Sequence, residues 1–148
     1  MDRLDGRWTT NTYDGPGNLA SVTDQANNTV QYTYDAANQL AAVGQLAHPI
    51  PAHNTNSYGY DDLGNLTVLT DENGHGTVNA FDLLANNIAK TLPDGSLTET
   101  RGYDSAGNLL SLQHFNGQTT TYAYDPLDRL TAKTPDPSFD KAMLSFVY

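Results

Sequence analysis

A seven-residue phrase that recurs six times is the feature that most constrains how this chain can fold. The phrase is an aromatic residue, an aspartate, two variable residues, a residue that tolerates a left-handed backbone, a polar residue and a leucine. The aromatic residues that begin its copies are 21, 26, 21, 22 and 21 residues apart: Tyr13, Tyr34, Tyr60, Phe81, Tyr103 and Tyr124. A fixed period in this range is the sequence signature of a repeat architecture.

The second, fifth and seventh positions of the phrase predict a hairpin. An aspartate can accept hydrogen bonds from backbone N–H groups two residues further on, which favours a turn. The second-position aspartates are Asp14, Asp35, Asp61, Asp82, Asp104 and Asp125. The fifth-position residues are Gly17, Asn38, Gly64, Ala85, Gly107 and Asp128. Glycine, asparagine and aspartate tolerate positive φ, which a type I turn closed by a G1 bulge requires. Only alanine departs from that set, so we expect an altered loop at Phe81-Asp82.

A strand follows each turn. The leucines that begin the returning strands on their apolar side are Leu19, Leu40, Leu66, Leu109 and Leu130. A second turn signal comes about ten residues after each phrase begins, as in residues 24–28, 71–74, 93–96 and 116–117. Residues 29–34 and 119–124 alternate with period two, and residues 66–70 and 109–112 are apolar on both faces. One repeat is therefore predicted to be strand, turn, strand, turn, with no helix.

Composition agrees with many short strands and excludes several classes of protein. The hydrophobic content is 38% and the charged content only 16%, with a net charge of −10. Such acidity disfavours nucleic acid as a partner, although six of the fifteen aspartates belong to the phrase itself. The chain has no cysteine, no stretch long enough to span a membrane, and no signal peptide at residues 1–5.

Two insertions and the two ends break the repeat. Residues 45–53 and 134–140 contain prolines that a central strand would not hold, so we expect exposed loops there. Residues 1–5 are similar to half of a phrase, and residues 145–148 to the strand leading into a further one. We therefore expect residues 1–148 to be an array of about six repeats cut at both ends.

The repeated Tyr-Asp-x-x-Gly-Asn-Leu phrase resembles the YD repeats of RHS-repeat proteins, and the resemblance covers nearly all of the chain. That family includes bacterial polymorphic toxins, insecticidal toxin complexes and the animal teneurins. The resemblance implies hairpins laid side by side in a strip that spirals into a hollow shell, which in the bacterial members encloses a toxin segment. The family's self-cleaving region, rich in Asp-Pro and Gly, has no counterpart here.

Three patterns could indicate metal sites, and each has a simpler explanation. The repeated aspartates could hold calcium, but each more simply caps its own turn. Residues 71–76 with Asp82 partly imitate an EF-hand loop, but His75 replaces an oxygen ligand and flanking helices are absent. His48 and His53 lack a third ligand for zinc. We therefore expect no metal, no cofactor and no catalytic residue.

The tyrosines offer a binding alternative. Tyr32, Tyr58 and Tyr122 precede phrase tyrosines by two residues and share a strand face with them, so this face could stack carbohydrate. Cross-strand aromatic packing is the simpler interpretation, because such pairs stabilise sheets.

The sequence thus predicts an all-β fold of tandem antiparallel hairpins forming a curved open sheet. The predicted function is the structural, non-catalytic wall of a shell that encloses a toxin or effector. The alternative is a carbohydrate- or protein-binding surface module. We expect a secreted or cell-surface parent protein whose neighbouring repeats are the partners of this segment. When isolated, the segment should self-associate through its unpaired sheet edges.

Overall fold

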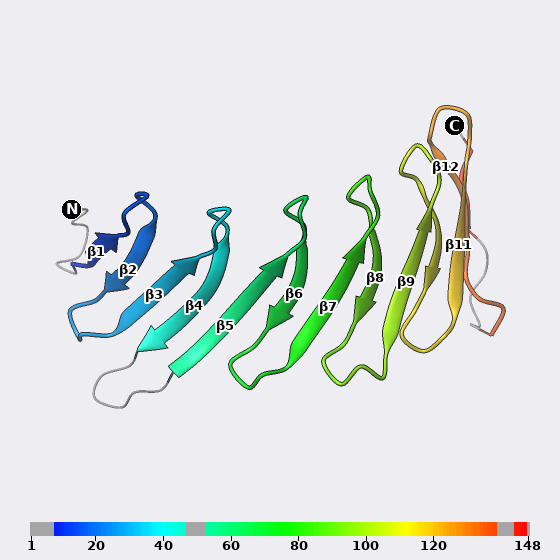
Figure 1. Cartoon of the computed structure of the whole chain (residues 1–148). Helices are drawn as coiled ribbons and strands as arrows, with labels where there is room; N and C mark the ends of the chain where they lie inside the picture. Colours follow the sequence, from blue (N-terminus) through cyan, green and yellow to red (C-terminus); the bar gives the residue numbers. More distant parts are fainter. Residues whose placement is uncertain (1–7, 47–52, 139–143, 148) are drawn as a thin grey trace. The chain divides into compact units, whose positions relative to one another are not determined.

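The computed structural model describes residues 8–46, 53–138 and 144–147, and among these every regular element is a β-strand (Figure 1). The chain divides into two units, Met1–His75 and Gly76–Tyr148. The strands of the first unit are β1 (Thr10–Tyr13), β2 (Leu19–Thr23), β3 (Thr29–Tyr34), β4 (Leu40–Leu46), β5 (His53–Tyr60) and β6 (Leu66–Thr70). The strands of the second unit are β7 (Gly76–Phe81), β8 (Asn87–Thr91), β9 (Thr98–Tyr103), β10 (Leu109–Gln113), β11 (Thr119–Tyr124), β12 (Leu130–Thr134) and β13 (Leu144–Ser145).

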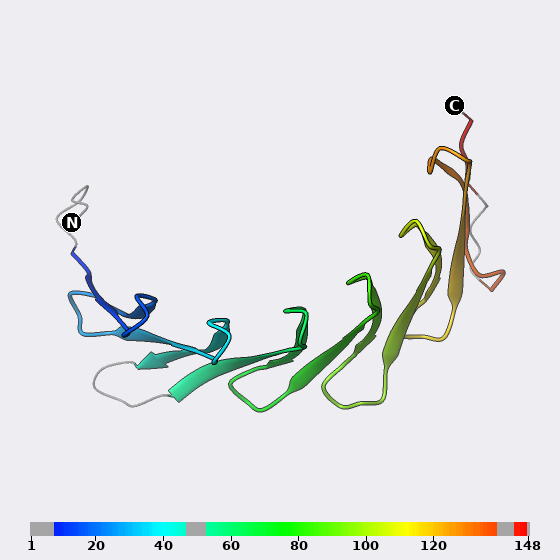
Figure 2. The ribbon, with the colours of Figure 1, turned by 45° about the horizontal axis from the view of Figure 1, so that its top comes forward.

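Strand order follows the sequence, so the topology is a series of hairpins with no crossover. Within each unit, every strand pairs antiparallel with the next one along the chain. The phrase turns project separately from one edge of each unit, the upper edge in Figure 1, and the second turns connect the strands at the lower edge. In Figure 2 the phrase turns bend out of the plane of their strands. The predicted all-β, open, antiparallel arrangement is confirmed.

The two faces of the sheet differ in side-chain size. One, the tyrosine face, carries Tyr32 and Tyr34 on β3, and the β3–β4–β5 register places Tyr58 and Tyr60 of β5 on the same face. The other, the small-residue face, carries in the second unit Ala80, Ala89, Thr100, Gly102, Ser111, Thr121, Ala123 and Ala132. A Cβ built on Gly102 would lie 2.7 Å from the Ser111 hydroxyl oxygen of the neighbouring strand, so a larger residue at position 102 would require Ser111 to move.

No hydrophobic side chain among the described residues is buried, and the one buried residue is Thr120, at 4% exposure. Except for Tyr13, the phrase aromatics and leucines are half-buried, because a single layer of sheet covers each side chain only with its neighbours on the same face. Tyr13, at 63% exposure, is less covered than the other phrase tyrosines. Hydrophobic burial therefore stabilises this fold less than it does a two-layered domain.

The strand positions predicted from periodicity are confirmed. Residues 29–34, 66–70 and 119–124 are β3, β6 and β11, and the strand predicted at 109–112 extends one residue further as β10. No helix able to cross a membrane occurs in the described part of the chain.

Two loop predictions are corrected. The phrase that begins at Phe81 has the same turn as the others, because Ala85 adopts a φ of 62° and the turn's two backbone hydrogen bonds form at 3.0 Å. The insertion at 45–53 is shorter than predicted, since β4 continues to Leu46 and β5 begins at His53. Residues 47–52, with His48, lie outside the described residues.

The positive φ of the fifth position can be tested by substitution. Gly107 has a φ of 87°, and a β-branched residue is strongly disfavoured there. We expect Gly107→Val to lower the free energy of unfolding by about 1–3 kcal/mol, measured by thermal denaturation followed by circular dichroism. Gly15→Val is the control, because its Cβ would meet nothing within 4 Å and its φ lies outside the left-handed region. Equal stability of the two variants would show that the bulge is wrongly assigned.

Candidate functional site

The phrase turn is the most organised group of polar side chains in the chain, and Asp104 shows how it is built. One carboxylate oxygen, Oδ1, accepts the backbone N–H groups of Ala106 at 2.9 Å and Asn108 at 2.8 Å. The other, Oδ2, accepts the side-chain amide of Asn108 at 3.0 Å. Two backbone hydrogen bonds close the turn, from Gly107 N to Asp104 O at 3.1 Å and from Asp104 N to Asn108 O at 3.0 Å. The carboxylate therefore holds both ends of its own loop.

The same network recurs in the other phrase turns. The carboxylates of Asp35, Asp61, Asp82 and Asp125 each accept the backbone N–H groups two and four residues on, at 2.8–3.0 Å. Asp14 differs slightly, since it accepts the N–H groups three and four residues on. Each aspartate is thus committed to its own turn.

These hydrogen bonds change the acidity of the aspartates. The side-chain amide and the backbone N–H of Asn108 lower the pKa of Asp104, because both stabilise the ionised carboxylate. The side-chain amide of Asn65 is likewise the largest cause that lowers the pKa of Asp61. In the last phrase the side chain of Arg129 lowers the pKa of Asp125. These carboxylates are therefore ionised caps at neutral pH and poor proton donors.

The phrase tyrosines join successive hairpins. The β10–β11 ladder runs from Gln113 and Thr119 only as far as Ser111 and Thr121, short of the phrase-turn edge. Beyond it, the Tyr124 hydroxyl donates to the Leu109 carbonyl oxygen at 3.1 Å. The corresponding bonds run from Tyr34 to Leu19 at 3.2 Å, from Tyr60 to Leu40 at 3.0 Å and from Tyr103 to Asn87 at 3.1 Å. Each hydroxyl thus supplies a donor where backbone pairing has ended.

Two turns at the opposite edge, those after β2 and β6, use the same aspartate hydrogen bonds without the tyrosine. Asp24 accepts the N–H groups of Ala26 at 2.8 Å and Asn28 at 2.9 Å, and Asn27 has a φ of 63°. Asp71 does the same for Asn73 and His75, both at 2.9 Å. The loop that imitates an EF-hand is therefore a hairpin turn, in which the His75 ring lies 3.2 Å from the Asp71 carboxylate.

The described residues contain no group of three or more histidine and acidic side chains that could hold a metal ion. His48 lies outside the described residues, and only the backbone of His53 is placed, in β5. The sequence-predicted aspartates are not brought together either, because each points into its own turn. No cofactor site can be built from them.

A shallow depression of about 580 Å³ lies between the turns that follow β3 and β5 in the first unit. Its lining residues are Asp35, Ala36, Ala37, Gln39, Tyr60, Asp61, Asp62, Leu63 and Gly64. Two of its three carboxylates, those of Asp35 and Asp61, cap turns. Small-molecule sites enclose most of their ligand's surface, which this open depression does not. We therefore assign it no ligand.

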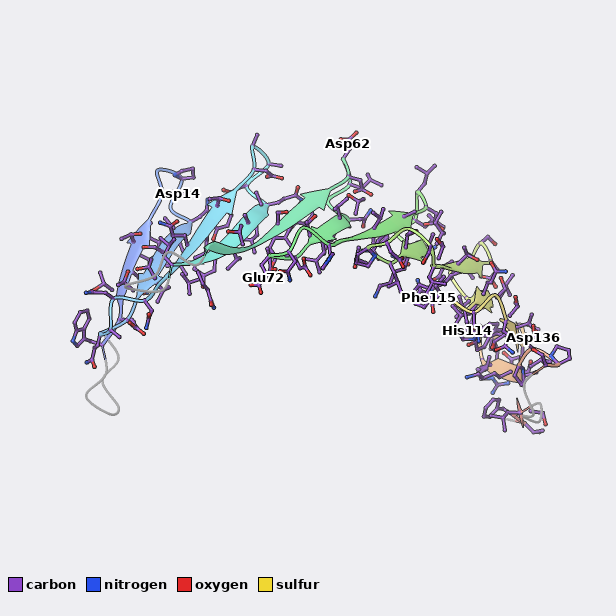
Figure 3. The ribbon with its side chains drawn as sticks, turned by 90° about the horizontal axis from the view of Figure 1, so that it is seen from below. Asp14, Asp62, Glu72, His114, Phe115 and Asp136 are labelled. Carbon is purple, nitrogen blue, oxygen red and sulfur yellow. The ribbon has the colours of Figure 1, made fainter. Side chains whose placement is uncertain are left out.

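The residue that is buried among those described, Thr120, lies in a corner of the second unit beside the turn that joins β10 to β11. Thr120 contacts His114, whose ring nitrogen Nε2 lies 3.0 Å from its hydroxyl. The segment after β12 covers this corner, since Thr119 N donates to Asp136 Oδ2 at 3.1 Å and Gln118 Nε2 to Ser138 Oγ at 2.7 Å (Figure 3). Thr120 as a whole residue is only 4% exposed, so we assign this group a structural role.

The tyrosines of the predicted ligand face, Tyr32, Tyr58 and Tyr122, are half-buried on the tyrosine face. The Lys133 ammonium group lies 5.7 Å from the centre of the Tyr122 ring. In the first unit, Tyr32 pairs across the sheet with Val43 and Tyr58 with Leu69. The strand partners of these tyrosines are Val43, Leu69 and Lys133 and not aromatic residues, so cross-strand aromatic packing stays a prediction.

Two functional roles escaped sequence reasoning. The hydroxyl of the first position bonds a backbone carbonyl, and the sixth position bonds the aspartate. The role of the sixth position could have been inferred, because every residue there carries a side-chain donor: Asn18, Gln39, Asn65, Asn86, Asn108 and Arg129. The role of the first position was indicated by tyrosine, which occupies it in five of the six phrases.

Comparison with known families agrees with this turn chemistry. The sequence model of the RHS Repeat family matches residues 13–46 and 103–137, which contain four of the six phrases. The chain carries RHS repeats. The resemblance drawn from the phrase is therefore confirmed. Among curated proteins the sequence has no match.

Solved toxin-complex structures share the fold of this RHS-repeat chain. The crystal structures of TcdB2-TccC3-Cdc42 and of TcdB2-TccC3 without its hypervariable C-terminal region each match 86% of the chain, with a TM-score of 0.70 and 22% identity. A Photorhabdus luminescens Tc holotoxin pore matches 84%, with a TM-score of 0.69 and 22% identity. The chain spans 7% of the length of each matched chain. At this identity the likeness shows the fold alone.

The tyrosine hydroxyl bond can be tested by removing one oxygen atom. We expect Tyr124→Phe to lower the free energy of unfolding by about 1 kcal/mol, because the Leu109 carbonyl loses its donor. Tyr122→Phe is the matched control on the same strand and face, since the Tyr122 ring packs under Lys133 and its hydroxyl bridges no hairpins in the described residues. Chemical denaturation of both variants measures the difference. Equal losses would mean that the bond does not stabilise the hairpin junction.

The capping carboxylates make stability depend on pH. Their folded pKa values lie below the ordinary 3.8, so their contribution is complete above that value and is lost as the pH falls through the folded pKa values. We expect the melting temperature to fall below about pH 3.8 and Asp61→Asn to weaken this dependence. Asp62→Asn removes the same charge from the same loop but no cap, so it should leave the dependence unchanged. Identical profiles for the two variants would contradict the capping role.

Proposed function

We propose that this RHS-repeat chain forms part of the wall of a hollow shell that encloses a polypeptide toxin or effector, and that its role is structural. The observation that carries the proposal is a single layer of self-closing hairpins with no buried hydrophobic side chain among the described residues. Such a layer encloses space rather than filling it. The fold shared with TcdB2-TccC3 supports the same conclusion.

The distribution of polar groups supports a wall rather than an enzyme. A catalytic site needs an acid, base or nucleophile free to meet a substrate. In this chain the repeated carboxylates accept hydrogen bonds from their own turns, and the repeated tyrosines donate to backbone carbonyls. We therefore infer that the repeats perform no reaction.

The array and its setting follow from the same proposal. We infer that residues 1–148 are about six consecutive repeats of a longer array, in a secreted or cell-surface protein whose neighbouring repeats continue the strip. Isolated from those neighbours, the segment is still expected to self-associate through its edge strands. No observation favours the carbohydrate-binding alternative, whose tyrosines, Tyr32, Tyr58 and Tyr122, are half-buried in the sheet.

The proposal is tested on the full-length natural protein that contains this array. Electron microscopy should show a hollow particle, and limited proteolysis should leave an enclosed segment intact. Gly107→Val in that protein should expose the segment to protease, whereas Gly15→Val should not. A solid or fibrous particle with no protected segment would refute the shell, and glycan binding by such a particle would favour the surface-module alternative.

A further inference from the structure

Successive phrase turns touch each other through two defined positions. In the first unit, the side-chain amide of Asn18, in the sixth position of its phrase, donates to Asn38 Oδ1, in the fifth position of the next. Asn38 Nδ2 donates back to Asn18 Oδ1 at 3.1 Å. The second amide hydrogen of Asn18 is used within its own turn, where Nδ2 lies 3.1 Å from Asp14 Oδ2. One side chain therefore serves two turns.

The second unit repeats the arrangement with different residue types. Asn108 Nδ2 donates to Asp104 Oδ2 at 3.0 Å within its own turn and to Asp128 Oδ1 at 2.7 Å in the next turn. An amide has two donor hydrogens, and both are satisfied by carboxylates here. The contact again joins a sixth position to the following fifth position, 20 residues further on.

Where the fifth position is glycine, the sixth-position side chain of the preceding phrase lies near the point where a Cβ of the glycine would stand. The Gln39 Nε2 atom lies 3.1 Å from where a Cβ of residue 64 would stand, and Asn86 Oδ1 lies 3.8 Å from the corresponding point of Gly107. In these four pairs the sixth-position side chain lies beside the fifth position of the next turn. Where that position is glycine, Gln39 presents its Nε2 atom and Asn86 its Oδ1 atom.

We propose that the sixth-position side chain is a register lock, which binds the fifth position of the following turn and determines which two turns can lie side by side. The backbone ladder between hairpins ends before this edge, so side chains must align the turns there. A fifth-position carboxylate can only accept, and therefore requires a donor in the sixth position before it. The lock operates within the array and holds whether or not the array encloses anything.

A double-mutant cycle at Asn108 and Asp128 tests the lock. Asp128→Asn recreates the natural Asn18–Asn38 pair, so we expect its melting temperature to stay within about 2 °C of wild type. Asn108→Asp places two carboxylates against each other and should lower the melting temperature by about 5 °C or more, since 1 kcal/mol corresponds to roughly 4–8 °C in a domain of 60–100 residues. The double variant should recover part of the loss, because the carboxylate introduced at position 108 would then meet an amide donor.

The double-mutant cycle separates the contribution of the contact between turns from that of the contact between residue 108 and Asp104 within one turn. Asn108→Asp also opposes Asp104 in its own turn, but that cost is present in both the single and the double variant. The effect of Asp128→Asn should therefore change from neutral to stabilising when residue 108 is aspartate. If Asp128→Asn has the same effect in both backgrounds, or if the single and double variants are both unfolded, the lock is refuted.

Substitutions at two glycine positions provide a second test, in which a variant gains a contact instead of losing one. Gly107→Asn should acquire the lateral bond to Asn86, whereas Gly117→Asn has a similar φ, 82° against 87°, and no neighbour within 4 Å. We expect Gly107→Asn to have the higher melting temperature of the two by a few degrees, as one additional hydrogen bond would give. An equal or lower melting temperature for Gly107→Asn would overturn the proposal.

Discussion

The fold depends on one interaction, the acceptance of two backbone N–H groups by the aspartate carboxylate of each phrase turn. In most domains a buried hydrophobic core stabilises local structure, but here no hydrophobic side chain is buried in the described residues. Turn geometry must therefore be specified locally, repeat by repeat. The carboxylate of Asp104 does so with hydrogen bonds that span only four residues. Repeat proteins are generally stabilised by such short-range contacts, since each repeat contacts only its neighbours.

Successive hairpins must also be joined to one another, and near the phrase turns side chains form that junction. The tyrosine hydroxyl reaches the preceding hairpin where the backbone ladder stops, as Tyr124 does toward Leu109. Phenylalanine would supply the packing of the ring but not the donor. The sixth-position amide then connects the turns themselves, as between Asn108 and Asp128. Each of these positions of the phrase thus makes a defined contact. The aspartate and fifth residue close a turn, and the first and sixth residues attach that turn to its neighbours.

Much of this arrangement was accessible from the sequence because it is local. Period-two alternation located β3 and β11, and the aspartate with a left-handed fifth residue predicted the turn. The prediction for Ala85 was wrong because residue preference was weighed alone. The hydrogen bonds of Asp82 hold that alanine at positive φ in the same turn as its neighbours. The lateral contacts could not be predicted, since residues 20 apart meet only when the register between hairpins is known.

Charged side chains are also distributed according to the repeat, and their placement supports a structural role. In the first unit the strands contain no lysine, arginine, aspartate or glutamate. In the second unit the strand charges are those of Lys90, Glu99, Arg101 and Lys133, all on the tyrosine face. The described aspartates lie instead outside the strands, and the six at the second position of a phrase accept hydrogen bonds within their own turns. Apart from Glu99, the acidic side chains of the described residues therefore lie outside the strands, and the described strands place no lysine, arginine, aspartate or glutamate on the small-residue face. This face is not free of larger apolar groups, since Leu46, Val68 and Val78 lie on it, so strand charge and not apolar content distinguishes the two faces.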